Sequence, residues 1–166
     1  MEPWQRIDTG SPDEARHLLQ RCCGSALWTD RMLARRPFGS QARLLAVARD
    51  EWFALAREDW LEAFSHHPKI GDRDTLQKRF AATRQLSERE QAGVDGASDV
   101  VLDALAAGNR AYEEKFGYIF IVCATGKNAS EMLGLLRSRL GNDPAVELRI
   151  AAAEQAKITE IRLERL

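Results

Sequence analysis

Residues 117–129, G-Y-I-F-I-V-C-A-T-G-K-N-A, interrupt an otherwise helical pattern and so determine the fold class. The middle of this stretch is apolar and β-branched, and glycines bound it, which indicates a short buried extended segment near 118–124. Elsewhere apolar residues recur at helical spacing, while alternating strand patterns are nearly absent. The sequence therefore predicts an all-α fold, a single compact multi-helix domain with one short extended segment.

Capping signals place most of the helix boundaries. Ser11 with Glu14 is a capping-box pair, and Gly117 stands where a residue able to adopt φ > 0 is favoured after a helix. Similar signals, a capping residue before the helix and glycine or proline after it, recur along the chain. They predict helices over about 12–23, 25–35, from 40, up to 67, 74–82, from 87, 98–116, 128–141 and from 143 onward.

Length, composition and charge limit the possible classes of protein. The chain has 166 residues, of which 45% are hydrophobic, and this predicts one domain over residues 1–166. With 24 basic and 25 acidic side chains the formal charge is −1, so no overall field favours nucleic acid or an anionic membrane as a partner. The longest apolar runs fall short of the roughly 20 residues of a spanning helix, and the N-terminus has no signal-peptide pattern. We expect a soluble, cytoplasmic protein.

The three cysteines show neither a disulfide framework nor a metal-binding spacing. Cys22 and Cys23 are adjacent, and Cys123 lies inside the apolar segment. This pattern suits a reducing cytosol, and the expected role of all three is packing. No metal ligand set is predicted.

Residues 65–74, S-H-H-P-K-I-G-D-R-D, contain two adjacent histidines followed by proline. Pro68 disfavours an α conformation at His67, so the preceding helix must end there and can present an imidazole at the wall of a cleft. Histidine exchanges a proton near neutral pH and is a candidate acid or base. Alternatively, His66 and His67 are ordinary rings at a helix C-terminus. A metal site is less favoured, because neighbouring histidines rarely chelate one ion and no third ligand stands one turn away.

Ser87, Glu90 and Gln91 belong to S-E-R-E-Q, which allows two interpretations. As a capping box, Ser87 and Glu90 satisfy backbone N–H groups of one helix, and this is the commoner case. As a site, they place a hydroxyl, a carboxylate and free N–H donors at the positive end of a short helix, where a polar ligand could be held.

Two further features could bind a polar ligand. The apolar segment has backbone groups that need partners if it is buried and not helical, and a bound heterocycle could supply them. Arg162, in I-T-E-I-R-L, could hold a carboxylate or a ureido group bidentately. The alternatives are a simple core segment and a solvated helical arginine.

Four motifs together carry a family resemblance: H-P-K-I-G-D from His67, S-x-x-E-Q from Ser87, F-G-Y-I-F-I-V-C-A-T-G-K-N-A from Phe116, and I-x-x-I-R-L from Ile158. The N-terminal patterns C-C-G-S-A-L-W-T-D-R-M and R-P-F agree with them. The chain resembles, over essentially its whole length, 2-oxo-4-hydroxy-4-carboxy-5-ureidoimidazoline (OHCU) decarboxylase, the last enzyme of the pathway from urate to allantoin. His66 lies outside the core motif.

The resemblance implies an all-helical, cofactor-free, usually homodimeric enzyme that decarboxylates OHCU to (S)-allantoin. It implies that His67 is essential and that Glu90 acts with it as a catalytic residue. It also implies that the substrate is bound by the side chains or backbone groups of Pro68, Ser87, Gln91, Ile119, Phe120, Ile121, Val122 and Arg162. No metal and no cofactor is implied.

Two other functions remain open on the sequence. A related hydrolase of ureido rings on the same scaffold would activate water and leave the carboxylate in place. A helical interaction module without catalysis would need an exposed apolar patch, whereas an enzyme needs a polar concave pocket.

Overall fold

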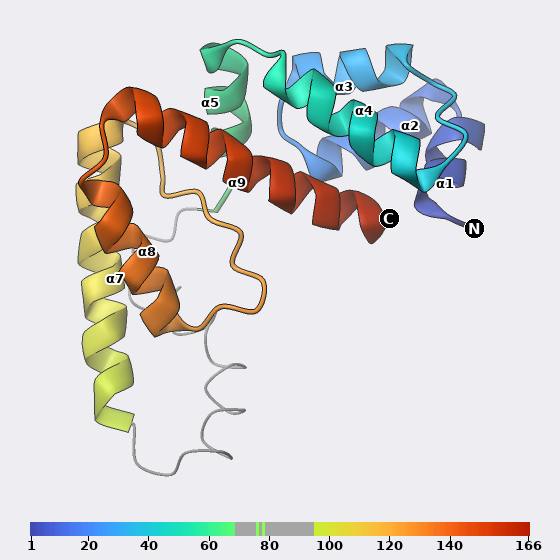
Figure 1. Ribbon diagram of the computed structural model, residues 1–166. Coiled ribbons are helices and arrows are strands. Elements are labelled where there is room, and N and C mark those ends of the chain that lie inside the picture. Colours follow the sequence, from blue (N-terminus) through green and yellow to red (C-terminus); the bar gives the residue numbers. More distant parts are fainter. Residues whose placement is uncertain (69–75, 77, 79–94) are drawn as a thin grey trace. The chain divides into compact units, whose positions relative to one another are not determined.

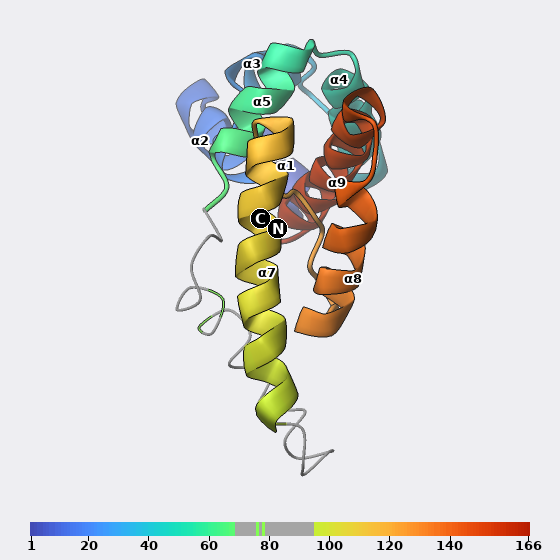
Figure 2. The same cartoon turned by 90° about the vertical axis from the view of Figure 1, so that its left-hand side faces the viewer.

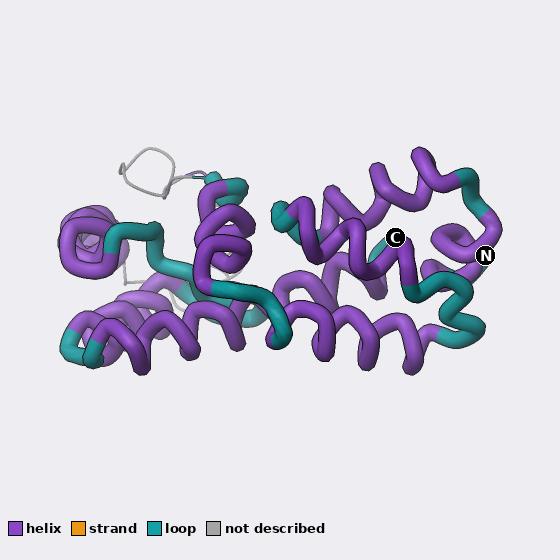
Figure 3. Tube along the Cα trace, turned by 90° about the horizontal axis from the view of Figure 1, so that it is seen from above, coloured by secondary structure: helices purple, strands orange, loops and turns teal. Residues whose placement is uncertain are grey.

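The computed structural model describes residues 1–68, 76, 78 and 95–166. All regular secondary structure in this part is helical, and no strand occurs in it (Figures 1 and 3). The all-α class predicted from the sequence is confirmed. The chain divides into two compact units, Met1–His67 with Arg149–Leu166, and Pro68–Leu148, and each is described by itself. None of the described helices is both long enough and apolar enough to cross a membrane.

The first unit contains five complete helices and most of a sixth. They are α1 (Pro3–Thr9), α2 (Pro12–Cys22), α3 (Ala26–Ala34), α4 (Gln41–Phe53), α5 (Arg57–Ser65) and the part of α9 (Pro144–Glu164) that follows Leu148.

Side-chain caps fix the helix starts where the sequence predicted them. The Ser11 hydroxyl accepts a hydrogen bond from the Glu14 backbone N–H at 3.3 Å, and the Glu14 carboxylate accepts one from the Ser11 N–H at 2.8 Å. Helix α1 was not predicted. Its signals are Pro3 in the first turn and Gln5, whose side-chain oxygen accepts from the Glu2 N–H at 2.8 Å.

Three tryptophans join the helices of the first unit through their indole N–H groups. Trp28 of α3 donates to the carbonyl of Ala48 in α4 at 3.0 Å. Trp52 of α4 donates to the carbonyl of Ala152 in α9 at 2.8 Å. Trp60 of α5 donates to the carbonyl of Trp52 at 2.9 Å. Each ring therefore buries apolar area while its polar atom keeps a partner.

The second unit is built on α7 (Asp95–Phe116) and α8 (Ala129–Leu140), which lie side by side in Figures 1 and 2. Gly108 allows the close approach, since a Cβ there would lie 2.6 Å from Leu136 Cδ2. Helix α7 begins three residues before the predicted Ser98, so that start was wrong. The helix includes Gly96, because one glycine costs a helix only about 1 kcal/mol.

Gly117 follows the last residue of α7; it has φ +81° and donates its N–H to the Glu113 carbonyl at 2.8 Å. Beyond it, residues 119–124 have no regular secondary structure, and Phe120, Ile121 and Val122 are buried. The positive φ after the helix and the buried extended segment are both confirmed.

A buried ionic network holds this segment. Arg139 of α8 pairs with Glu147 of α9 through Nε and Oε1 at 2.7 Å, and its Nη1 donates to the Ile121 carbonyl at 2.7 Å. Glu147 also accepts from the Tyr112 hydroxyl at 2.5 Å and from Asn142 Nδ2 at 2.9 Å. Arg139 is 6% exposed and Glu147 is fully buried, so removing either side chain would leave the other charge buried without its partner.

We predict that Trp52→Phe lowers the free energy of unfolding by about 1–3 kcal/mol, because it removes a buried hydrogen bond and part of a packed ring. Urea unfolding monitored by circular dichroism measures this. Phe53→Leu is the matched control on the same helix, since Phe53 is 40% exposed. Equal unfolding midpoints for the two variants would show that the Trp52 contact contributes little.

We predict that Arg139→Met costs about 3–5 kcal/mol, because it leaves the Glu147 carboxylate buried without its cation. The double variant Arg139→Met/Glu147→Gln removes that stranded charge and keeps an acceptor for Tyr112. It should therefore recover much of the loss in the same urea experiment. A double variant no more stable than the single one would contradict this account.

Candidate active site

His67 follows the C-terminal end of α5. The N–H of His66 donates to the Ala63 carbonyl and that of His67 to the Phe64 carbonyl, both at 3.2 Å, which closes the last turn. Pro68 comes next, so the helix ends where the sequence predicted. His67 is half-buried, whereas His66 is exposed.

The two adjacent imidazoles have different partners. The His66 ring lies against Gly24, where an added Cβ would be 2.5 Å from the His66 Cγ atom. The His67 ring is hydrogen-bonded through Nε2 to the side-chain oxygen Oε1 of Gln155 on α9. The structure thus separates the two histidines by their surroundings.

Gln155 is a residue that the sequence reasoning missed. Its side chain is 1% exposed, and its Nε2 donates to the Thr159 hydroxyl at 3.1 Å. The available signal was spacing, because Gln155 and Thr159 stand seven and three residues before Arg162 on one helix face.

Arg162 shares α9 with Gln155, about 10 Å further along the axis at 1.5 Å per residue. Its Nη1 donates to the carbonyl of Cys22 at 3.3 Å, and the residue remains exposed overall. Two predicted residues of the first unit therefore meet at one helix: Arg162 belongs to α9, and His67 is hydrogen-bonded to it through Gln155. The guanidinium keeps donors beyond the one bound to Cys22.

The cysteines behave as packing residues, as expected. Cys22, Cys23 and Cys123 are all buried and free. Burial raises the pKa of the Cys22 thiol to about 12 and that of Cys23 to about 11. Both thiols of the first unit are therefore protonated at neutral pH and are poor nucleophiles.

The extended segment of the second unit offers backbone donors. The Ile121 carbonyl is taken by Arg139. The N–H groups of Ile119, Phe120, Ile121 and Val122 donate no hydrogen bond to any residue in the described ranges. A buried backbone outside regular structure needs hydrogen-bond partners, and a bound ligand could supply them to these N–H groups.

The remaining predicted residues are placed as follows. Pro68 is exposed and is the first residue of the second unit. Ser87, Glu90 and Gln91 lie outside the described residues. Among residues 1–68, 76, 78 and 95–166, no group of three or more His, Cys, Asp or Glu side chains is arranged to hold a metal ion.

Comparisons with known proteins agree on one family. The family model for OHCU decarboxylase matches residues 8–164. The 2-oxo-4-hydroxy-4-carboxy-5-ureidoimidazoline decarboxylase of Amia calva is 39% identical over 156 residues, which cover 89% of this chain and 82% of that protein. The uric acid degradation bifunctional protein TTL of Arabidopsis thaliana is 44% identical over 148 residues, or 87% of this chain. The chain spans 45% of the length of TTL.

A solved structure gives the same result. A crystal structure of OHCU decarboxylase in the presence of (S)-allantoin is 38% identical, covers 94% of this chain and 97% of that one, and has a TM-score of 0.72. A crystal structure of (S)-allantoin synthase, 18% identical with a TM-score of 0.69, has a similar fold. The chain belongs to the OHCU decarboxylase family, a family of carboxy-lyases in urate degradation.

Proposed function

We propose that this chain decarboxylates OHCU to (S)-allantoin without a cofactor, with His67 as the essential acid–base group. The family match over residues 8–164 supports the reaction, and the family relative crystallised with (S)-allantoin supports the product. The observation that carries the role of His67 is its half-buried imidazole, held at a helix end by Pro68 and by a buried amide. Because the family match includes residues of both units, residues 1–166 act as one functional domain.

The substrate makes a metal or cofactor unnecessary. Its carboxylate is attached to a tetrahedral ring carbon next to a C=N bond. When the bond between the two carbons breaks, CO2 leaves and the electron pair passes into the ring. The hydroxyl-bearing carbon becomes the ring carbonyl. A proton is added to one face of the neighbouring carbon, which carries the ureido arm and was part of the C=N bond, and this gives a single enantiomer. The protein must hold the substrate and move protons. Positioning lowers the barrier by several kcal/mol. General acid–base catalysis raises the rate by about 10²–10⁴-fold.

Each proposed residue has a role that suits its chemistry. His67 interacts with the hydroxyl and carboxylate and assists the bond cleavage. Glu90, with Ser87 and Gln91, fixes N–H groups of the ring or the ureido arm. Arg162 holds the ureido carbonyl or negative charge, since a guanidinium binds such groups bidentately.

Backbone and packing groups complete the proposed site. The N–H groups at Ile119, Phe120, Ile121 and Val122 donate to oxygens of the heterocycle, and Pro68 limits the position of the His67 backbone. The support for the backbone role is that these N–H groups have no partner among the described residues.

We predict that His67→Asn abolishes most of the turnover, by about 10²–10⁴-fold, because it removes the proton-exchanging group. Circular dichroism at an allantoin-sensitive wavelength follows (S)-allantoin formation from substrate freshly made from urate by urate oxidase and 5-hydroxyisourate hydrolase. His66→Asn is the matched control and should keep most of the rate, since that ring packs against Gly24.

The same assay separates the competing functions. A hydrolase would consume the substrate without releasing CO2, and a helical interaction module would leave the slow spontaneous decay unchanged. Undiminished turnover in a folded His67→Asn protein would overturn the assignment of the histidine.

We also propose that the protein is a cytoplasmic homodimer whose only ligand is OHCU, with no nucleic-acid or membrane partner. The dimer rests on the family resemblance, and the buried free thiols suit a reducing compartment. We predict a mass of twice the chain mass by light scattering at micromolar concentration. A monomer under these conditions would contradict the proposal.

A further inference from the structure

The hydrogen bond between His67 and Gln155 joins two side chains that are 88 positions apart in the sequence. Gln155 is almost fully buried on α9, and His67 is half-buried beyond the end of α5. A buried amide that binds a histidine normally fixes both the direction of the ring and the nitrogen that carries the proton.

The neighbours of Gln155 define the direction of this hydrogen bond. The Thr159 hydroxyl is a hydrogen-bond partner of the Cys23 thiol. Gln155 Nε2 donates to the Thr159 hydroxyl at 3.1 Å. The amide oxygen of Gln155 faces Nε2 of His67. An oxygen without a proton can only accept, so Nε2 of His67 is the donor.

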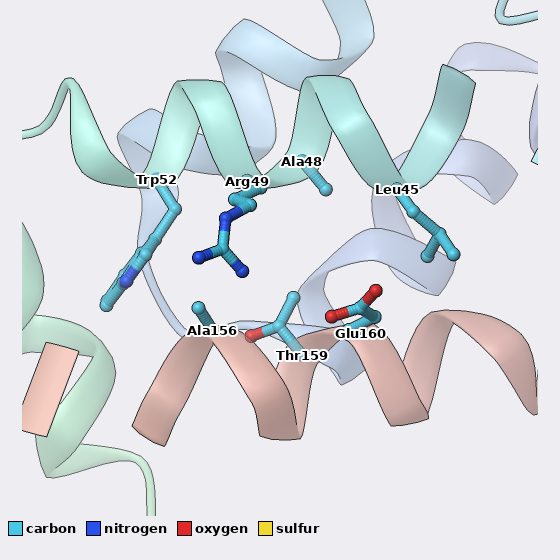
Figure 4. Close-up of a pocket in the computed structure, with 7 residues that line it drawn as sticks. All are labelled: Leu45, Ala48, Arg49, Trp52, Ala156, Thr159 and Glu160. Atoms are coloured by element: carbon cyan, nitrogen blue, oxygen red, sulfur yellow. The ribbon is translucent and has the colours of Figure 1, made fainter. Parts of the chain in front are cut away.

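The support for this chain of bonds is well packed. Gln155 is 1% and Thr159 is 5% exposed. Figure 4 shows Thr159 and Ala156 on α9 facing Ala48 and Trp52 on α4, around a pocket of about 10 Å³. Thr159 therefore stands at the contact between α4 and α9.

We propose that Gln155 is a positioning residue for His67, which keeps a proton on Nε2 and makes Nδ1 the nitrogen that exchanges a proton with the substrate. This inference deepens the proposed function and rests on it for the catalytic role of His67. When neutral His67 accepts a proton, it does so at Nδ1 and becomes an imidazolium protonated on both nitrogens. Release of the same proton from Nδ1 restores the starting tautomer, so the cycle leaves the bond to Gln155 intact.

The first test is nuclear magnetic resonance on protein labelled with ¹⁵N-histidine, without substrate. The sequence has 3 histidines, so His17→Gln and His66→Gln assign the His67 signals. In the wild type we expect a protonated Nε2 whose proton exchanges slowly with water, and an unprotonated Nδ1. Gln155→Leu should lose the slow Nε2 proton, and Gln155→Glu should keep it, because a carboxylate oxygen also accepts.

The second test is kinetic and uses the (S)-allantoin assay. Gln155→Leu should lower kcat by about tenfold or more with little change in KM, since part of the acid–base contribution is lost. Gln155→Glu should recover part of this loss. Thr29→Val is the matched control, because it removes another buried hydroxyl hydrogen bond of the first unit, to the Ser25 carbonyl at 3.2 Å. It should leave kcat unchanged.

The outcomes separate this inference from the proposed function. A wild-type protein with no (S)-allantoin activity overturns the proposed function, while the resonance data still decide whether Gln155 sets the tautomer. A proton on Nδ1 in the wild type, or a slow Nε2 proton retained in Gln155→Leu, overturns the positioning role. If Gln155→Leu does not fold, Thr159→Val removes the support of the amide and must show faster Nε2 proton exchange than Thr29→Val.

Discussion

The first unit depends on the helical period of α9, which places four groups on one face. Ala152, Gln155, Thr159 and Arg162 follow one another at spacings of three, four and three residues. Each contacts a different part of the unit: the Trp52 indole of α4, the His67 ring after α5, the Cys23 thiol and the Cys22 carbonyl. The rigidity of one helix thus sets the positions of an imidazole and a guanidinium that the sequence separates widely.

In both units, buried polar side chains hold in place parts of the chain that lie outside the helices. In the second unit, the Arg139–Glu147 pair holds a carbonyl of the extended segment, which has no ladder or helix partner. In the first, Gln155 holds the ring of a residue just outside a helix. An apolar side chain at either position would pack equally well but could not orient a hydrogen-bonding group.

Local signals predicted much of the fold, and long-range partners account for what was missed. Ser11 with Glu14 caps α2 as expected, because a capping box lies within one turn. The start of α7 was misplaced because the cost of one glycine is smaller than the gain from extending a helix. Pro68 identified the helix end that presents His67, but nothing near His67 reveals Gln155, because the bond between them forms only when α9 packs in place.

His66 and His67 show why residue type alone does not identify a site. Both stand at the same helix end, and either could exchange a proton near neutral pH. The helix ends before Pro68, and the two rings reach different neighbours, a glycine backbone for His66 and a buried amide for His67. A glycine has no side chain that could hydrogen-bond an imidazole. An amide oxygen can accept a hydrogen bond only from a ring nitrogen that carries a proton, so Gln155 can select the tautomer of His67. The contact of His66 with Gly24 has no such effect.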